Sequence, residues 1–188
     1  MREAKKERVF VVIDGSNFYH RLKEKPIHFE NLLEFNFLDF IKWLVKNRKL
    51  VRACYYVGAI RTEKGNKKSF KLFRDQRKLL GILTKNKIDI SLGYILKTKK
   101  YHEKGVDVQI AVDLLTGAYE DLWDTVILLS SDTDLLPAIQ KVLQLGKSIE
   151  YFGFSHKPSF AMIRFATTSK LLDKEDLLPF ISKGKKKK

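Results

Sequence analysis

The stretch Val126–Pro137 reads VILLSSDTDLLP and joins a run of large aliphatic residues to two aspartates one residue apart. Apolar and polar residues do not alternate in Val126–Leu129, and such a continuous apolar run is typical of a strand buried on both faces. From Leu135 onward the apolar spacing predicts a helix. Asp132 and Asp134 therefore follow the carboxyl end of a buried strand, where α/β folds bind their ligands.

Helix capping explains the same two acids without any ligand. Asp132 can cap a helix through its side chain, and Asp134 in the first turn is favoured by the helix dipole. For this stretch alone, capping and a functional site are equally good interpretations.

Length and composition predict one α/β domain over residues 1–182, followed by a basic, disordered tail over 183–188. No apolar run reaches about 18 residues, and the N-terminus lacks the features of a signal peptide. The chain has one cysteine, Cys54, which cannot form an internal disulfide. We therefore expect a cytoplasmic protein with a reduced, buried thiol.

The net charge of +15 is unevenly distributed along the chain. Residues 61–104 hold 14 Lys and Arg against 4 Asp and Glu, whereas residues 105–182 hold 6 against 11. Such asymmetry favours a polyanion bound beside an acidic site. A solvated, lysine-rich surface is the alternative interpretation.

Strand and helix patterns alternate along the chain. Helices are predicted near 36–47, 68–86, 106–119 and 134–145, and strands near 8–13, 50–58, 88–96, 125–130 and 147–152. Shorter helices are expected over 158–165 and 174–181. The alternation indicates βαβ units, and hence a doubly wound α/β/α sandwich with a mainly parallel sheet of order 3-2-1-4-5.

Two further aspartates occupy comparable positions. Asp14 follows the first strand in the turn-like sequence Asp14–Asn17, and Asp107 opens the helix predicted near 106–119. A turn explains the first of these alone and a helix cap explains the second. In a sheet of the predicted order, the first and fourth strands are neighbours, so Asp14 and Asp132 should lie close together.

Carboxylates packed together are costly unless a cation neutralises them. Oxygen ligands with open positions suit Mg²⁺ or Mn²⁺. Zinc is disfavoured because the four histidines lack ligand spacing and Cys54 is the single cysteine. We therefore predict a divalent-metal site that includes Asp132 and Asp134.

Four segments resemble the NYN domain, more narrowly the LabA-like branch of the PIN-like nucleases. They are DGSN (14–17), KGVDVQIAVDLL (104–115), SSDTDLLP (130–137) and the strand LGKSIEYFG (145–153). The resemblance covers roughly residues 8–180. Two departures from the usual family motif SGDSDF matter: Ser131 replaces its glycine and Leu135 its phenylalanine. Neither change removes a carboxylate.

The resemblance implies a PIN-like fold and a divalent-metal-dependent ribonuclease site. It implies metal ligation by four acids, with Asn17 as a polar companion in catalysis: Asp14, Asp107, Asp132 and Asp134. Water activated by the metal would cleave RNA to a 5′-phosphate and a 3′-hydroxyl. Asp113 belongs to the matching motif, but it lies about 240° around the helix from Asp107 and is expected to contact the site indirectly at most.

RNA contacts are expected from the basic middle of the chain. On the helix near 68–86, basic residues follow helical spacing on one face, and a basic loop leads into the Asp107 motif: Lys71, Arg74, Lys78, Lys85, Lys99 and Lys100. With aromatic residues nearby, such stripes suit single-stranded RNA. Ser130 and Lys104 could contact phosphate, although a turn hydroxyl and a solvated charge explain them equally simply.

Two functions of different class follow from these observations. The first is a Mg²⁺- or Mn²⁺-dependent endoribonuclease acting on RNA, with no membrane partner. The second is a non-catalytic RNA-binding or regulatory NYN module. The presence of all four acids favours the enzyme. A homodimer is left open by the sequence.

Overall fold

The structure is a computed structural model that describes residues 6–97 and 101–181 and, within these, all side chains except those of 94–97 and 101–104. In this part of the chain, no helix is long and apolar enough to cross a membrane. The tail predicted to be disordered lies outside the described residues, as do Lys99 and Lys100.

The described residues form one seven-stranded sheet in the order β4-β3-β2-β1-β5-β6-β7. β4 is antiparallel to β3, and all other neighbouring strands are parallel. The strands are β1 (Arg8–Asp14), β2 (Lys49–Gly58), β3 (Asp89–Lys97), β4 (Tyr101–Lys104), β5 (Thr125–Leu129), β6 (Ser148–Phe154) and β7 (Thr168–Leu172). The six parallel strands run 3-2-1-4-5-6 in chain order, which confirms the predicted order and extends it by β7.

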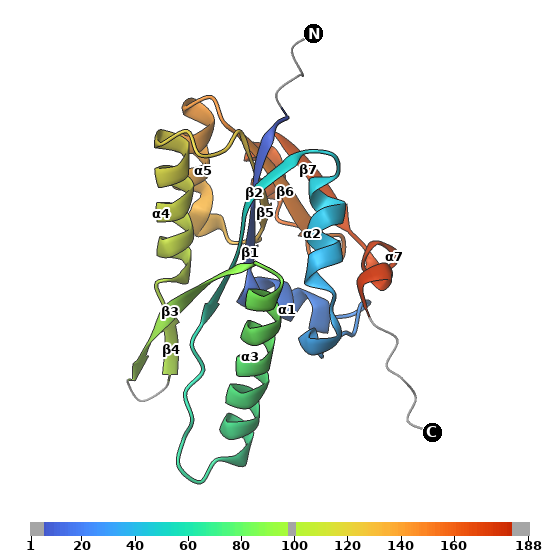
Figure 1. The fold of residues 1–188 in the computed structure, drawn as a ribbon, viewed down its shortest axis with the longest axis vertical. Coiled ribbons are helices and arrows are strands. Elements are labelled where there is room, and N and C mark those ends of the chain that lie inside the picture. The colour runs from blue at the N-terminus through green and yellow to red at the C-terminus, as the bar shows by residue number, and fades with distance from the viewer. Residues whose placement is uncertain (1–5, 98–100, 182–188) are drawn as a thin grey trace.

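Helices cover both faces of this sheet (Figure 1). They are α1 (Gly15–Lys23), α2 (Phe37–Val45), α3 (Lys67–Lys85), α4 (Val106–Tyr119), α5 (Leu136–Gln144), α6 (Phe160–Phe165) and α7 (Lys174–Leu177), with 3-10 turns η1 (Leu32–Glu34), η2 (Thr133–Leu135) and η3 (Leu178–Phe180). α1, α2, α3 and α7 pack on one face, and α4, α5 and α6 pack on the other. The predicted doubly wound α/β sandwich is confirmed.

The position of the central strands β1 and β5 explains why apolar and polar residues do not alternate along them. Val9, Val11 and Ile13 of β1 enter the core on the α2 side, whereas Phe10 and Val12 enter the core on the α4 side. All five residues of β5 are buried in the same way. A parallel strand between two layers of helices needs apolar residues on both faces.

α1, β4 and β7 were not predicted from the sequence. Asp14–Asn17 was expected to form a turn, but Asp14 instead caps α1 by accepting a hydrogen bond from the Asn17 backbone N–H (3.0 Å). The helix signal was present in the spacing of Phe18 and Leu22, both fully buried. β7 was missed because four of its five residues are at least partly exposed and it forms the edge of the sheet.

The single cysteine is buried on β2, as expected. Burial raises the pKa of the Cys54 thiol to about 11. The thiol therefore stays protonated at neutral pH, which makes it unreactive.

Gly15 is required by close packing at the start of α1. A Cβ atom at this position would lie 2.4 Å from the Tyr55 ring, and Tyr55 is itself only 1% exposed. We expect Gly15→Ala to reduce the free energy of unfolding by about 1–3 kcal/mol, because the buried ring has little room to move. Chemical denaturation measures the change.

Gly81→Ala is the matched control, since nothing lies within 4 Å of a Cβ added on the exposed side of α3. There alanine should be neutral or stabilising by up to about 1 kcal/mol, through helix propensity. Equal effects at the two glycines would contradict the close packing of Gly15 against Tyr55.

Candidate active site

Asp14 is the last residue of β1, and Ser130 directly follows the neighbouring strand β5 at the same level of the sheet. Ile13 of β1 pairs with Leu129 of β5, so the residues that follow them emerge side by side. The Ser130 hydroxyl donates a hydrogen bond of 2.8 Å to Asp14 Oδ2. Both side chains are buried, with exposed fractions of 5% for Asp14 and 1% for Ser130.

The same hydroxyl extends the network to Asp132. Ser130 Oγ accepts a hydrogen bond from the Asp132 backbone N–H (3.2 Å) while it donates to Asp14. One serine therefore connects the two acidic segments across a sequence separation of more than a hundred residues. In this structure the hydroxyl faces Asp14 and not solvent, so it holds the carboxylate in place.

Asp132 and Asp134 lie at the start of η2. Asp132 Oδ1 accepts the Asp134 backbone N–H (2.9 Å), which is the cap that the sequence allowed. Asp132 Oδ2 and the whole Asp134 carboxylate make no hydrogen bond or ion pair with the described residues. Asp132 is half-buried and Asp134 is exposed. These oxygens are consequently open to a ligand.

Asp107 comes from a different layer of the fold. It lies in the first turn of α4 and is half-buried. Gly105 immediately before this helix has a φ of 87°, a left-handed conformation that favours glycine. α4 begins at the end of the sheet where β1 ends (Figure 1). We call the four aspartates at this end the acidic edge: Asp14, Asp107, Asp132 and Asp134.

A divalent cation fits the chemistry of the acidic edge. All four candidate ligands are carboxylates, which suit Mg²⁺ or Mn²⁺. Among the described residues, no three His, Cys, Asp or Glu side chains are grouped closely enough to hold a metal ion as they stand. The carboxylate oxygens of Asp132 and Asp134 that bind no described group lie at the start of η2, on Asp134 and on the residue that caps this short segment.

Asn17 lies one helical turn from Asp14. Its backbone N–H donates to Asp14, whereas its side-chain amide is half-buried and makes no hydrogen bond with the described residues. The amide is thus available to orient a water molecule or a substrate oxygen beside Asp14.

Asp113 attaches α4 to β2. Its Oδ2 accepts hydrogen bonds from Arg52 (2.8 Å) and Tyr56 (2.7 Å), and its Oδ1 accepts one from Gln109 (2.7 Å). Burial, with further contributions from Cys54 and Asp113, raises the pKa of the Tyr56 hydroxyl, which remains a donor. The sequence pattern does not reveal the contacts to Arg52 and Tyr56, because these residues lie more than 50 positions from Asp113 in the chain.

The basic face predicted for α3 is exposed. Lys71, Arg74, Lys78 and Lys85 are all accessible, opposite the buried Leu79 and Leu83. Arg74 makes one ion pair of 3.5 Å, with Asp75, and its side chain remains 64% exposed. The side chain of Lys104 lies outside the described part of the chain.

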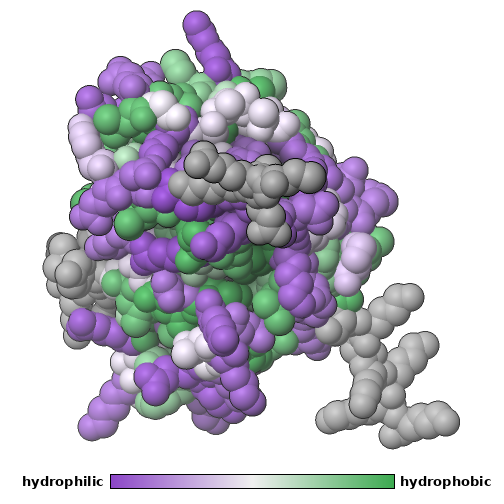
Figure 2. Space-filling model, turned by 45° about the horizontal axis from the view of Figure 1, so that its top comes forward, coloured by the Kyte–Doolittle hydropathy of each residue, from purple (hydrophilic) through white to green (hydrophobic). Residues whose placement is uncertain are grey.

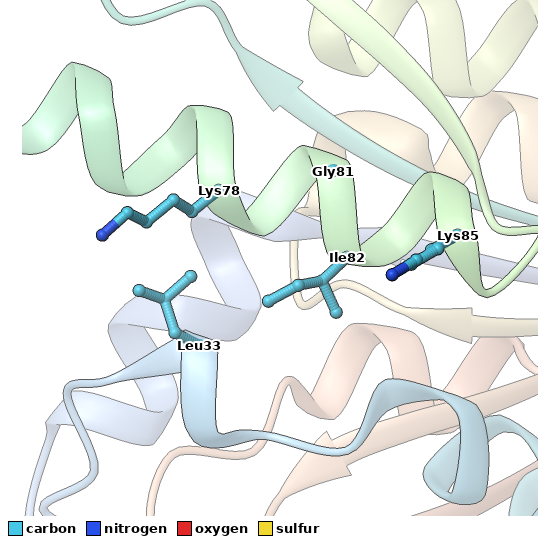
Figure 3. A pocket seen from close by; sticks show the side chains of 5 residues that line it. All are labelled: Leu33, Lys78, Gly81, Ile82 and Lys85. Atoms are coloured by element: carbon cyan, nitrogen blue, oxygen red, sulfur yellow. The ribbon is translucent and has the colours of Figure 1, made fainter.

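A shallow hollow of about 420 Å³ lies between α3 and η1. Leu33 and Ile82 form its floor, and Lys78 and Lys85 extend along its rim (Figure 3). None of the four aspartates lines it. The hollow therefore lies beside the basic face of α3, since Lys78 and Lys85 line it.

The class of protein follows from the comparison with known families, which identifies a PIN-like nuclease domain. The NYN domain profile matches residues 8–173, and the chain therefore belongs to the NYN domain family. This is a PIN-like nuclease family whose members are typically ribonucleases that use divalent metal ions and act on RNA.

The fold also occurs among solved structures. A protein of unknown function from Vibrio parahaemolyticus RIMD 2210633 is 23% identical, with a TM-score of 0.71 over 94% of this chain and 99% of that one. At this identity the likeness concerns the fold alone. No curated protein matches the chain at a significant level.

Proposed function

We propose that the protein is a divalent-metal-dependent endoribonuclease that hydrolyses RNA phosphodiester bonds at the acidic edge. The observation that carries the proposal is the hydrogen-bonded connection from Asp14 through Ser130 to Asp132. It holds two acidic segments together at the carboxyl ends of adjacent parallel strands, where α/β proteins bind ligands.

Asp14, Asp107, Asp132 and Asp134 would hold the metal ion. A Mg²⁺ or Mn²⁺ ion held there would supply positive charge beside a phosphate oxygen and would lower the pKa of a water molecule, so that it loses a proton and attacks phosphorus as hydroxide. Family membership supports this use of metal.

Ser130 acts on the reaction through Asp14. Its hydrogen bond fixes one carboxylate oxygen, and the Asn17 backbone N–H fixes the other (3.0 Å). A carboxylate held at both oxygens stays in one orientation, so little order has to be gained when substrate binds. The Asn17 side-chain amide lies on the next turn and can orient the attacking water.

The substrate is single-stranded RNA bound along the basic face of α3. Lysine and arginine side chains neutralise phosphates without reading sequence. Lys71, Arg74 and Lys78 are accessible to RNA, since all three side chains are exposed. Lys99, Lys100 and Lys104 are proposed to continue this track toward Asp107.

The direct test is cleavage of a mixed pool of single-stranded RNA by the purified protein, with Mg²⁺, Mn²⁺ or EDTA. We expect internal cleavage that requires metal and leaves a 5′-phosphate and a 3′-hydroxyl on the products. Products with 2′,3′-cyclic phosphate ends would contradict attack by water.

The helix caps favour a second candidate function. Asp14 and Asp132 both cap helical segments, so their presence also has a structural explanation. In that case the protein is a non-catalytic RNA-binding or regulatory module of the NYN family. RNA binding without cleavage in any metal would favour this module over the enzyme.

A further inference from the structure

α4 carries a second apolar stripe in addition to the one that faces the core. Its buried face consists of Val106, Ile110, Leu114 and Ala118. Its outer face presents large apolar side chains to solvent: Val108 (67% exposed), Val112 (48%), Tyr119 (62%) and, just after the helix, Leu122 (53%). Leu115 lies between them and is half-buried.

The spacing of the outer stripe is regular. The intervals between Val108, Val112, Leu115 and Tyr119 are four, three and four residues, and Leu122 lies beyond the end of the helix. This is the spacing with which one helix packs along another. We call these five residues the α4 seam. The face of the molecule drawn in Figure 2 shows apolar patches between hydrophilic side chains.

The surroundings of the α4 seam carry little net charge. Residues 105–124 contain no Lys or Arg in a chain whose net charge is +15. Two of the nearby acids are neutralised: Asp113 by Arg52 (2.8 Å), and Asp121 by Arg8 (2.8 Å) and Lys147. Beside the seam, Gln109, Ala111 and Thr116 are uncharged, and Glu120 is an exposed acid.

We propose that the α4 seam is a self-association surface through which two copies of this chain form a two-fold symmetric dimer. Two molecules with a charge of +15 repel each other over most of their surface. They can approach closely where positive charge is missing and apolar area is exposed, and a seam packed on its own copy meets both conditions. Tyr119, an exposed aromatic residue, would be its main anchor.

The test is the mass of the full chain in solution, measured by sedimentation equilibrium over a range of concentrations. We expect the wild type to rise from the monomer mass of 21.9 kDa toward twice that value. The association should strengthen with salt, because screening removes the repulsion between the two basic molecules. RNA binding would show the opposite dependence.

Paired charge variants distinguish self-association from other partners. Val112→Glu with Tyr119→Glu, and Val112→Lys with Tyr119→Lys, should each be monomeric, while an equimolar mixture of the two should recover dimer. Leu178→Glu is the matched control, because Leu178 is 51% exposed on η3 over the opposite face of the sheet. It should dimerise like the wild type.

A wild type that stays at the monomer mass would overturn the proposal and indicate that α4 binds a different protein. A mixture of Glu and Lys variants that stays monomeric would overturn it as well, provided circular dichroism shows both variants to be folded. So would a Leu178→Glu variant that dissociates like the seam variants.

Discussion

Asp132→Asn is expected to lower metal-dependent RNA cleavage by more than about 100-fold while leaving the fold intact. Asparagine keeps the side-chain oxygen that accepts the Asp134 N–H, and it caps helices about as well as aspartate. The substitution therefore removes the negative charge without removing the cap. A pure cap would tolerate this change, whereas a metal ligand would not.

Two measurements separate the loss of metal from the loss of structure. Cleavage is followed on single-stranded RNA in Mn²⁺, Mg²⁺ or EDTA, and the melting temperature is followed with and without Mn²⁺. A ligand that binds only the folded state stabilises it. Mn²⁺ should thus raise the melting temperature of the wild type more than that of the variant. Without metal, the variant should be equally stable or slightly more stable, since carboxylate repulsion is relieved.

Asp173→Asn provides the control at a cap outside the acidic edge. Asp173 accepts the Asp176 N–H at the start of α7, which reproduces the capping role of Asp132. It should leave cleavage and the Mn²⁺ effect unchanged. Asp14→Asn should resemble Asp132→Asn, and the double variant should be little worse than either, as for parts of one unit. Cleavage that survives Asp132→Asn would remove Asp132 from the site.

The fold could be predicted because its signals are local. β1 and β5 are continuous apolar runs, and the pattern of α4 predicted its bounds, Val106–Tyr119, without error. α1 was missed because a nine-residue helix that begins Gly-Ser-Asn has the composition of a turn. Its contacts with the core, through Phe18 and Leu22, and the cap from Asp14 stabilise it as a helix.

The candidate site could be predicted only in part, because its connections are not local. The positions of Asp14 and Asp132 at strand ends followed from the sequence, since parallel strands end at one edge. That Ser130 faces Asp14 depends on strand register, which places Leu129 beside Ile13. A sequence pattern does not contain that register. The Arg52–Asp113 contact between β2 and α4 was missed because the two residues lie 61 positions apart and meet only when the helix packs on the sheet.

Reversing two charges on α3 should weaken RNA binding with little effect on the fold. Arg74 and Lys78 are exposed and lie one turn apart, opposite the buried face. In Arg74→Glu with Lys78→Glu, two phosphate contacts are lost, and fewer counterions are released on binding. For single strands the slope of log affinity against log salt should become shallower by about 1.4, which corresponds to roughly 50-fold weaker binding near 50 mM salt.

The control must carry the same change in net charge, because a basic protein attracts RNA through its whole field. Lys42→Glu with Lys141→Glu meets this condition, since both lysines are exposed on other helices, α2 and α5. Fluorescence anisotropy of a labelled single strand, titrated at several salt concentrations, gives both slopes. If the α3 variant alone has the shallower slope, RNA contacts α3 directly. If both variants change equally, RNA responds to net charge and the track lies elsewhere.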